Sequence, residues 1–552
     1  MPNHPKPVIL TIIDGWGIAP AGPGNAITQA KTPNMQALWA SYVRTQLIAH
    51  GESVGLPKRE PGNTETGHLN LGAGRIVYQD LPRINISIAD GTFFQNPNLL
   101  AAANHAKKNK SSLHIMGLVG GGGVHSDLSH LFALLRLFHE QSVPGVFIHI
   151  FTDGRDSPPT ASMTYIQQIQ TVIAREGIGQ IASVMGRYYA MDRDFRWDRT
   201  SKAYFCLTAG RGKTAPNIKE AISMAYAAKE TDEFISPTVI TNSQNQPVTL
   251  IRDHDAVVFS NFRIDRPRQL TKSFVLPDFE KSANFAAFDP YTVKYYQKHE
   301  LDSKHLAKQK PFDRGNAISD LYFVTMTEYE KNLPVHTAFP PQPVDNPLAR
   351  VISDNNLRQL HVAESEKERF VTYYFNGLRE DPFPGEEHSI IPSPKVPTYD
   401  KKPEMSAREI TAKLISEVAT GQYDFIVVNF ANPDMVAHTG NIKATISACE
   451  LVDNCIGELA NTIIPSGGVL VITADHGNAE EMINPTTQSS DTEHNANPVP
   501  LIIAGLNFRI AHQVPQGILA DVAPTVLSLL QIPTPVSMIG RNLLSDIPNI
   551  NQ

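Results

Sequence analysis

Short runs of almost entirely apolar residues recur along the 552-residue chain, separated by segments with helical periodicity. These runs predict strands at 8–14, 113–119, 146–153, 181–186, 256–262, 321–326, 371–377, 425–430, 469–475 and 500–505. Continuous apolar strands are typical of sheets that are covered on both faces. Their alternation with helices favours an α/β fold with largely parallel sheets. A chain of this length exceeds one ordinary hydrophobic core, so we expect at least two domains.

Three segments carry clear helix signals. The segment 129–141 is amphipathic, and apolar residues recur every three or four positions over 446–463, which indicates a buried helix face. Ser406, followed three residues later by Glu409, has the pattern of a capping box. This pattern predicts a helix over 406–419.

The charge balance and the cysteines limit the functional class. A net charge of -7 with 19% charged residues argues against a nucleic-acid-binding or membrane-surface protein. The three cysteines form no CxxC pair, which is typical of reduced thiols in a cytosol. No stretch approaches the roughly 20 apolar residues that cross a bilayer, and the first apolar run is too short for a signal peptide. We therefore expect a soluble, cytoplasmic protein.

Carboxylate and imidazole side chains lie next to four of the predicted strands. These candidates are Asp14, Asp434, His438, Asp475, His476 and His494. Singly, each fits a turn residue, a helix cap or a hydrogen-bonded histidine. Ligands of open parallel sheets bind outside the carboxyl ends of the strands, so the convergence of several such ends favours a divalent-metal centre. Three aspartates and three histidines suit Mn²⁺ or Zn²⁺, and two ions need about this many ligands if each keeps a position open.

Thr64 lies in the glycine-flanked segment 61–75, PGNTETGHLNLGAGR. If a helix starts here, its free N–H groups would favour a phosphate on the threonine oxygen. A hydroxyl beside a divalent metal loses its proton more easily and becomes a useful nucleophile. The alternative is a threonine that only caps a helix before a glycine-rich turn.

The middle of the chain is rich in arginine within the short motifs 151–159, 186–199 and 261–268, and His125 lies in a further short motif at 125–127. The arginine fork binds carboxylate and phosphate groups through two hydrogen bonds. Several of these arginines follow predicted strands, which suits a small substrate with several negative charges. The alternative is a set of surface arginines paired with neighbouring aspartates, as in the run Asp192–Arg193–Asp194.

The candidate metal ligands and the arginine-rich motifs occupy different parts of the chain, and this separation suggests its domain organisation. We predict a discontinuous metal-binding domain over 1–78 and 342–552, with a second α/β domain inserted over 79–341. Linkers are expected at 76–83 and in the proline-rich segment 333–347, and the active site is expected between the domains. The polar segment 271–316 has no clear periodicity and is interpreted as an insertion without an assigned function.

The motifs resemble those of the cofactor-independent (2,3-bisphosphoglycerate-independent) phosphoglycerate mutases of the alkaline phosphatase superfamily. The resemblance covers nearly the whole chain apart from 271–316 and rests on TIIDGWG, GNTETGHLNLGAGRIVYQD, GGVHSD, FTDGRDSPPT, GRYYAMDRDFRWDR, NFRIDRPRQL, NPDMVAHTG and TADHGNAEEM. It implies an alkaline-phosphatase-like metal-binding domain, a monomer and an isomerase of glycolysis and gluconeogenesis. This isomerase would interconvert 3-phosphoglycerate and 2-phosphoglycerate without added 2,3-bisphosphoglycerate.

The resemblance also implies residue roles. One divalent metal would be held by Asp434, His438 and His494, and the other by Asp14, Asp475, His476 and the Thr64 hydroxyl. Manganese is expected, with zinc, cobalt or magnesium as alternatives. The substrate positions are His125, Arg155, Asp156, Arg187, Arg193, Arg263, Arg266 and Lys367. Thr64 would form a phosphothreonine, and Asp156 would be the general acid and base on the glycerate hydroxyls.

Two positions depart from the family pattern. The family usually has serine in GNSEVGH where this chain has Thr64, whose added methyl group restricts the side-chain torsion. Asp127 stands where many members have histidine.

Two other functions are kept open: a phosphatase, phosphodiesterase or sulfatase of the same superfamily, and a non-catalytic binding protein. The residues expected to bind glycerate argue against the hydrolase, which would not need them. The presence of all six aspartates and histidines argues against a non-catalytic binding protein.

Overall fold

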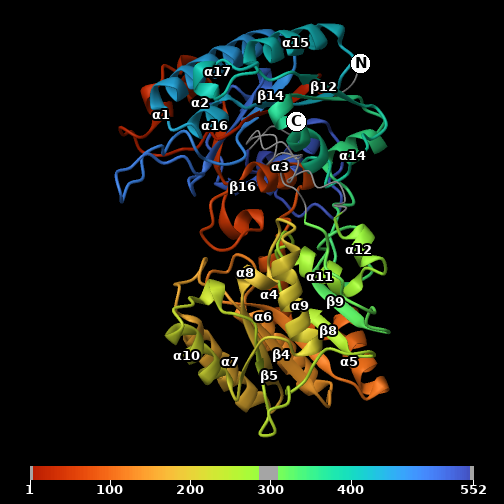
Figure 1. Ribbon diagram of the computed structural model, residues 1–552. Coiled ribbons are helices and arrows are strands. Elements are labelled where there is room, and N and C mark those ends of the chain that lie inside the picture. The colour runs from red at the N-terminus through yellow and green to blue at the C-terminus, as the bar shows by residue number, and fades with distance from the viewer. Residues whose placement is uncertain (1–3, 285–308, 548–552) are drawn as a thin grey trace. The chain divides into compact units, whose positions relative to one another are not determined.

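The computed structural model describes residues 4–284 and 309–547, and the chain divides into two compact units. Unit 1 comprises Met1–Pro82 and Gln342–Gln552, and unit 2 comprises Arg83–Pro341. In Figure 1 the red N-terminal and blue C-terminal segments accordingly lie in the same unit. The predicted class, a discontinuous α/β unit with a second α/β unit inserted, is confirmed.

Unit 1 contains an eight-stranded sheet within the described residues. Its order is β12 (Glu386–Ile391), β11 (Gln359–Glu364), β13 (Phe425–Phe430), β1 (Val8–Ile13), β14 (Val469–Thr473), β15 (Val499–Ala504), β2 (Val43–Ile48) and β16 (Gly517–Ile518). Neighbouring strands are parallel except at β14–β15 and β15–β2. Every residue of β1, β13 and β14 is buried, as expected for strands covered on both faces.

Helices cover this sheet in two groups. One group is α1 (Ala26–Gln29), α2 (Pro33–Ser41), α15 (Ala407–Thr420), α16 (Asn432–Ala437) and α17 (Ile442–Ile463). The other is α3 (Thr64–Ala73), α14 (Leu348–Asp354) and α18 (Val522–Leu529), which pack on one another. Figure 1 shows α15 and α17 on one side of the sheet and α3 on the other. The long α17 confirms the predicted helix over 446–463.

Unit 2 contains a second eight-stranded sheet within the described residues. Its order is β10 (His336–Phe339), β9 (Tyr322–Thr327), β8 (Ala256–Phe259), β3 (Leu113–Val119), β4 (Val146–Thr152), β5 (Gln180–Gly186), β7 (Thr238–Ile240) and β6 (Lys213–Ala215). Only β5–β7 is antiparallel among these described pairs. The connecting helices include α6 (Leu128–Glu140), which matches the helix predicted over 129–141.

The other α-helices within the described residues of unit 2 complete its layers. They are α5 (Pro97–Asn109), α7 (Ser162–Glu176), α8 (Arg187–Ala190), α9 (Trp197–Ala209), α10 (Ile218–Ala227), α11 (Arg268–Val275) and α12 (Phe279–Ser282), while α4 (Asp80–Asp90) spans the boundary between the units. The helices α11 and α12 occupy the first part of the predicted insertion 271–316. Its residues 285–308 lie outside the described residues.

Two local predictions are wrong. The segment 371–377 was predicted as a strand, but Phe370–Tyr374 forms a π-helix. The neighbouring β11 already fills the sheet position, and the π-helix packs on α3 instead. The capping box at α15 does not form, because the Ser406 hydroxyl donates to the Pro392 carbonyl at 2.8 Å rather than capping the helix.

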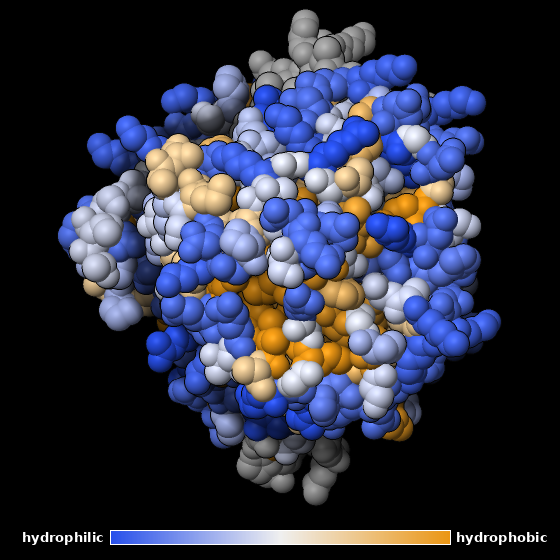
Figure 2. Space-filling view, turned by 60° about the horizontal axis from the view of Figure 1, so that its bottom comes forward, coloured by the Kyte–Doolittle hydropathy of each residue, from blue (hydrophilic) through white to orange (hydrophobic). Residues whose placement is uncertain are grey.

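Charged and polar side chains cover most of the face shown in Figure 2. Within the described part of the chain, no helix combines the length and apolar character needed to span a bilayer.

Candidate active site

Three parallel strands of unit 1 end at one edge of the sheet. The register pairs Ile13 of β1 with Phe430 of β13, and Ile12 with Thr473 of β14. Asp14 follows β1 directly, and its carbonyl accepts a hydrogen bond from the backbone N–H of Asp434 at 3.1 Å. The strand order therefore brings together residues that lie more than four hundred positions apart in the sequence.

Asp434, His438 and His494 form the first group. The Nε2 atoms of His438 and His494 lie 3.1 and 3.3 Å from Asp434 Oδ1, and 3.1 Å from each other. The other ring nitrogen of each histidine faces a main-chain carbonyl, Thr492 at 2.7 Å and Gly62 at 3.0 Å. A carbonyl only accepts, so each Nδ1 carries a hydrogen, and in the neutral imidazole each Nε2 presents a lone pair.

Two nitrogen lone pairs and a carboxylate oxygen facing one another are unfavourable without a positive charge between them. A histidine that donates Nδ1–H to a carbonyl and presents Nε2 is the usual arrangement of a metal ligand. The donor set of this group therefore fits a divalent cation.

Asp14, Asp475, His476 and Thr64 form the second group. His476 Nε2 lies 3.0 Å from Thr64 Oγ1, 3.4 Å from Asp14 Oδ1 and 3.5 Å from Asp475 Oδ2. All four residues are buried. Donor atoms of Asp14, Asp475 and His476 lie within 4.8 Å of one another, as do those of Asp434, His476 and His494, so His476 joins the two groups.

Lys367 lies among these side chains in unit 1. Its Nζ is 2.9 Å from Asp14 Oδ1 and 2.8 Å from Asp434 Oδ2, and it donates to Thr64 Oγ1 at 3.2 Å. Burial by itself would lower the pKa of Lys367, but Asp14 and Asp434 raise it overall. The ammonium therefore keeps its charge beside the threonine hydroxyl.

Thr64 is the first residue of α3. Asn63 caps this helix by accepting the Thr66 N–H at 2.9 Å, which confirms that a helix starts here but gives the capping role to Asn63. The N-terminus of a helix attracts anions. Gly67, one turn later, is required by close packing, since a Cβ there would lie 2.6 Å from the Cβ of Asp475.

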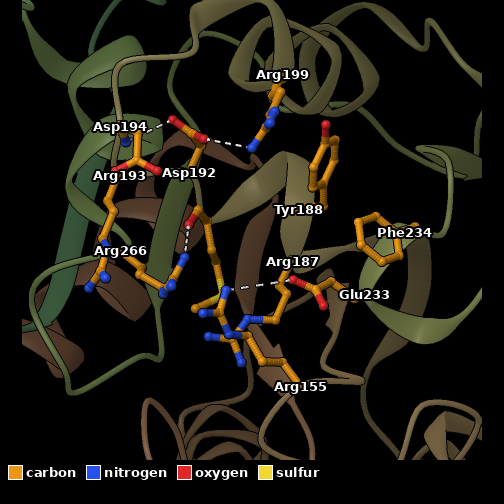
Figure 3. A pocket seen from close by; sticks show the side chains of 11 residues that line it. Arg155, Arg187, Tyr188, Asp192, Arg193, Asp194, Arg199, Glu233, Phe234 and Arg266 are labelled. Carbon is orange, nitrogen blue, oxygen red and sulfur yellow. Dashed lines mark hydrogen bonds and ion pairs between the residues drawn. The ribbon is translucent and has the colours of Figure 1, made fainter. Parts of the chain in front are cut away.

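A cavity of about 250 Å³ in unit 2 holds the arginine cluster (Figure 3). Arg155, Arg187, Arg193 and Arg266 line it, together with Tyr188, Glu233 and Phe234. The pKa of Arg266 falls to about 10 because of burial and the neighbouring arginines. Gathered guanidinium groups favour a small anion with several charges.

Arg187 is held by two carboxylates. Its Nη1 lies 2.6 Å from Asp153 Oδ1 and 2.5 Å from Asp156 Oδ2. Burial raises the pKa of Asp156, but Arg187 and other nearby cations lower it overall. Asp156 is therefore ionised at neutral pH and can accept a proton.

The Asp265 carboxylate contacts three of the predicted substrate residues. It pairs with Arg193 at 2.7 Å and Arg263 at 3.2 Å, and lies 3.6 Å from His125 Nδ1. His125 Nε2 is 3.8 Å from Asp156 Oδ2. Burial, helped by nearby arginines, lowers the pKa of His125 to about 4 although Asp265 opposes the shift, so the imidazole is neutral at physiological pH.

The prediction placed Lys367 with the substrate residues, whereas its contacts are with the carboxylates of unit 1. Sequence reasoning missed Asp153 and Asp265, although both lie inside the motifs that were singled out. It also missed Asn478, which donates to Asp434 Oδ1 at 2.9 Å and follows the Asp475–His476 pair. Asp127 caps α6 by accepting the Ser129 N–H at 2.8 Å.

A third group of possible ligands comprises His361, Glu386 and His388. Glu386 already accepts hydrogen bonds from His388 at 2.6 Å and Asn376 at 2.7 Å. Both ring nitrogens of His361 face oxygen acceptors, at 2.7 and 3.2 Å. These contacts describe a buried hydrogen-bond network.

Comparison with known proteins identifies the family of this chain. Residues 84–331 match the family model for the BPG-independent PGAM N-terminus. The 2,3-bisphosphoglycerate-independent phosphoglycerate mutase of Chloroflexus aggregans is 50% identical over 98% of this chain and 99% of its own length. The Moorella thermoacetica enzyme of that name is 47% identical, with 98% of each chain covered. A structure of Leishmania mexicana phosphoglycerate mutase at low cobalt concentration is 27% identical, with a TM-score of 0.56 and 97% of each chain covered. The chain belongs to the 2,3-bisphosphoglycerate-independent phosphoglycerate mutase family.

Proposed function

We propose that this protein interconverts 3-phosphoglycerate and 2-phosphoglycerate by transferring the phosphoryl group to Thr64 and back. The observation that carries the proposal is the position of Thr64 Oγ1. It lies at a helix N-terminus, 3.0 Å from His476 Nε2 and 3.2 Å from Lys367 Nζ. A hydroxyl in this setting suits attack on phosphorus, and the resulting phosphate would be stabilised by the helix N–H groups and the ammonium.

Two divalent cations complete the proposed site. Asp434, His438 and His494 would hold one, and Asp14, Asp475, His476 and the Thr64 hydroxyl would hold the other. Manganese suits this mixed oxygen and nitrogen set, and zinc, cobalt or magnesium are the alternatives. When bound, the cations lower the pKa of the threonine hydroxyl and neutralise charge on the transferring phosphoryl group.

The chain's own residues carry the rest of the reaction. The Thr64 hydroxyl loses its proton before the transfer, its oxygen attacks in line, the P–O bond to glycerate breaks, and a phosphothreonine forms; the return transfer releases the same Thr64 oxygen. Asp156 exchanges the proton between the two glycerate hydroxyls as one leaves and the other attacks. The arginine cluster, with His125, holds the glycerate and its charges so that it is not released before the return transfer. The phosphoryl group comes from the substrate itself, so no added 2,3-bisphosphoglycerate is required.

A phosphatase of the same superfamily is the second candidate, because threonine replaces the usual serine at the nucleophile position. It would use the same residues of unit 1. It would not need the cavity with its arginines or Asp156, which is why the mutase is preferred.

The test is an enolase-coupled assay on the purified chain with Mn²⁺ and without 2,3-bisphosphoglycerate, run in parallel with a phosphate-release assay. We expect 2-phosphoglycerate to form without phosphate release. Phosphate release from 3-phosphoglycerate without 2-phosphoglycerate would favour the hydrolase.

The nucleophile is tested by substitution in the same assay. Thr64→Ala removes the attacking oxygen and should abolish turnover, whereas Thr64→Ser keeps the oxygen and should retain or raise it. Thr66→Ala, on the same helix turn, is the matched control and should stay active. Full activity in Thr64→Ala would contradict the assignment.

The substrate is a small molecule in this proposal. The monomeric state and the cytoplasmic location stay predictions from the sequence.

A further inference from the structure

Two buried polar residues of unit 1, His68 and Asn429, link the carboxylates of Asp14 and Asp475. We propose that they are positioning residues that align these two carboxylates for the metal site they share with His476. The proposal rests on the ligand sets given under the proposed function. Neither residue belongs to those sets, and both are completely buried.

Asn429 uses its amide nitrogen twice. Asn429 lies on β13, opposite Ile12 of β1. Its Nδ2 donates to Asp14 Oδ2 at 2.8 Å and lies 3.0 Å from His68 Nε2. The reverse amide orientation would place two oxygen acceptors against each other at Asp14. The two amide hydrogens therefore point to Asp14 and to His68.

This orientation determines the tautomer of His68. Because His68 Nε2 accepts from Asn429, the ring hydrogen is on Nδ1. That atom lies 2.9 Å from the Thr64 carbonyl and 3.2 Å from Asp475 Oδ2, both of which are acceptors. In this arrangement Asn429 donates to Asp14 and to His68, and His68 Nδ1 donates to the Thr64 carbonyl, with Asp475 Oδ2 in contact with the same nitrogen.

This series of contacts determines which carboxylate oxygens of Asp14 and Asp475 are available to a cation. Asn429 engages Oδ2 of Asp14, so Oδ1 is directed toward His476 Nε2, 3.4 Å away. Asp475 Oδ1 accepts the backbone N–H groups of Gly15 at 3.3 Å and His476 at 3.1 Å, and His68 contacts Oδ2. The same His68 nitrogen also contacts the Thr64 carbonyl in the first turn of α3, at 2.9 Å. The hydrogen bonds and ion pairs of Asp434, His438 and His494 described above involve neither His68 nor Asn429.

The experiment measures Mn²⁺ binding by equilibrium dialysis on the full chain, and Asn429→Leu removes both amide hydrogen bonds while keeping a similar volume. We expect two equivalents on the unsubstituted chain. In Asn429→Leu one equivalent should weaken by about 10- to 100-fold, as is usual when an outer partner of a ligand is lost. The other should change by less than about threefold. Asn376→Leu is the matched control, because Asn376 is also buried and donates to a buried carboxylate, that of Glu386, at 2.7 Å.

Substitutions at His68 test the same link from its other end. His68→Phe keeps a ring but removes both nitrogens, whereas His68→Gln keeps a donor and an acceptor. We expect His68→Phe to weaken the same single equivalent, and His68→Gln to bind more tightly than His68→Phe. Folding is monitored by near-ultraviolet circular dichroism.

Unchanged binding in Asn429→Leu and His68→Phe would overturn the proposal, and so would equal weakening in Asn376→Leu. Unfolding of both site variants while Asn376→Leu folds would also overturn it, because the role would then be structural. If the unsubstituted chain binds fewer than two equivalents, the two-metal proposal itself fails.

Discussion

At the scale of single residues, His125 shows how the burial of an ionisable side chain affects stability. Its imidazole is buried among Asp265, Asp156 and several arginines, and its pKa is lowered to about 4. An unfolded histidine binds a proton near pH 6.5, while the folded one stays neutral until about pH 4. Between these values the unfolded state holds the extra proton, so stability falls as the pH falls.

The first prediction follows from this difference. Between pH 7.5 and pH 5, His125 should cost the folded state about 2 kcal/mol. In His125→Gln the pH dependence of the free energy of unfolding should be smaller by about that amount, measured by urea unfolding at both pH values. His254→Gln, at an exposed position, serves as the control. An unchanged pH dependence in His125→Gln would contradict the account.

Arg187 supports the second prediction, because one guanidinium bridges Asp153 and Asp156. Lysine keeps the charge but cannot reproduce the planar fork. Arg187→Lys should therefore lower kcat/KM for 3-phosphoglycerate by about 100-fold, or about 3 kcal/mol. The coupled assay measures this, and Arg136→Lys, on the exposed face of α6, should have no effect. Activity within twofold of the unsubstituted protein would argue against a role for the fork.

At the scale of secondary-structure elements, α3 and the turn after β14 pack so closely that one methyl group matters. A Cβ at Gly67 would lie 2.6 Å from both the Cβ and the carbonyl oxygen of Asp475. Gly67→Ala should displace either the helix that carries Thr64 or the loop that carries Asp475 and His476.

The third prediction is that Gly67→Ala lowers kcat at least tenfold and weakens Mn²⁺ binding, because misplacing reacting groups by a fraction of an ångström is costly. Kinetic assays and equilibrium dialysis measure the two effects. Gly22→Ala is the control, since a Cβ there has open space. If Gly67→Ala and Gly22→Ala had the same kcat and the same Mn²⁺ affinity, the close packing at Gly67 would not be needed for activity.

Most central strands could be predicted from the sequence because almost all of their residues are apolar. The short or half-buried strands were missed. β2 (VRTQLI) alternates buried and partly exposed residues, and β10 lies inside a proline-rich segment that was interpreted as a linker. The aromatic and β-branched residues of 371–377 have strand propensity, but packing on α3 and the bond from His361 to the Val371 carbonyl favour a π-helix.

The candidate site was predictable where residue type and strand ends coincide, as for Asp14 and Asp475. Side chains that orient other site residues, without contacting metal or substrate themselves, showed no such sequence pattern. Asp265 looked like one of several aspartates beside arginines, and its three partners are visible only in the structure. Asn429 lies within an apolar strand, so its pattern marks a core position rather than a polar contact.

At the scale of the whole molecule, every proposed metal ligand belongs to unit 1. The fourth prediction is that a chelator abolishes turnover and that Mn²⁺ restores it. Saturating Mn²⁺ should also stabilise the folded chain, by about 3 kcal/mol at a hundred times the dissociation constant. Scanning calorimetry with and without Mn²⁺ measures the shift. Turnover that persists in metal-free protein would reject the two-metal scheme.

The discontinuity of unit 1 also has a consequence for synthesis. Asn429 lies 415 positions after its partner Asp14, and β1 pairs with β13 and β14, which leave the ribosome late. At about 5–20 residues per second, β1 waits tens of seconds for its neighbours. The contiguous unit 2 can fold within that interval. During translation, the nascent chain thus carries a complete arginine cavity before it can bind metal or form a nucleophile, so catalytic competence arises only after Asp475, His476 and His494 have been synthesised.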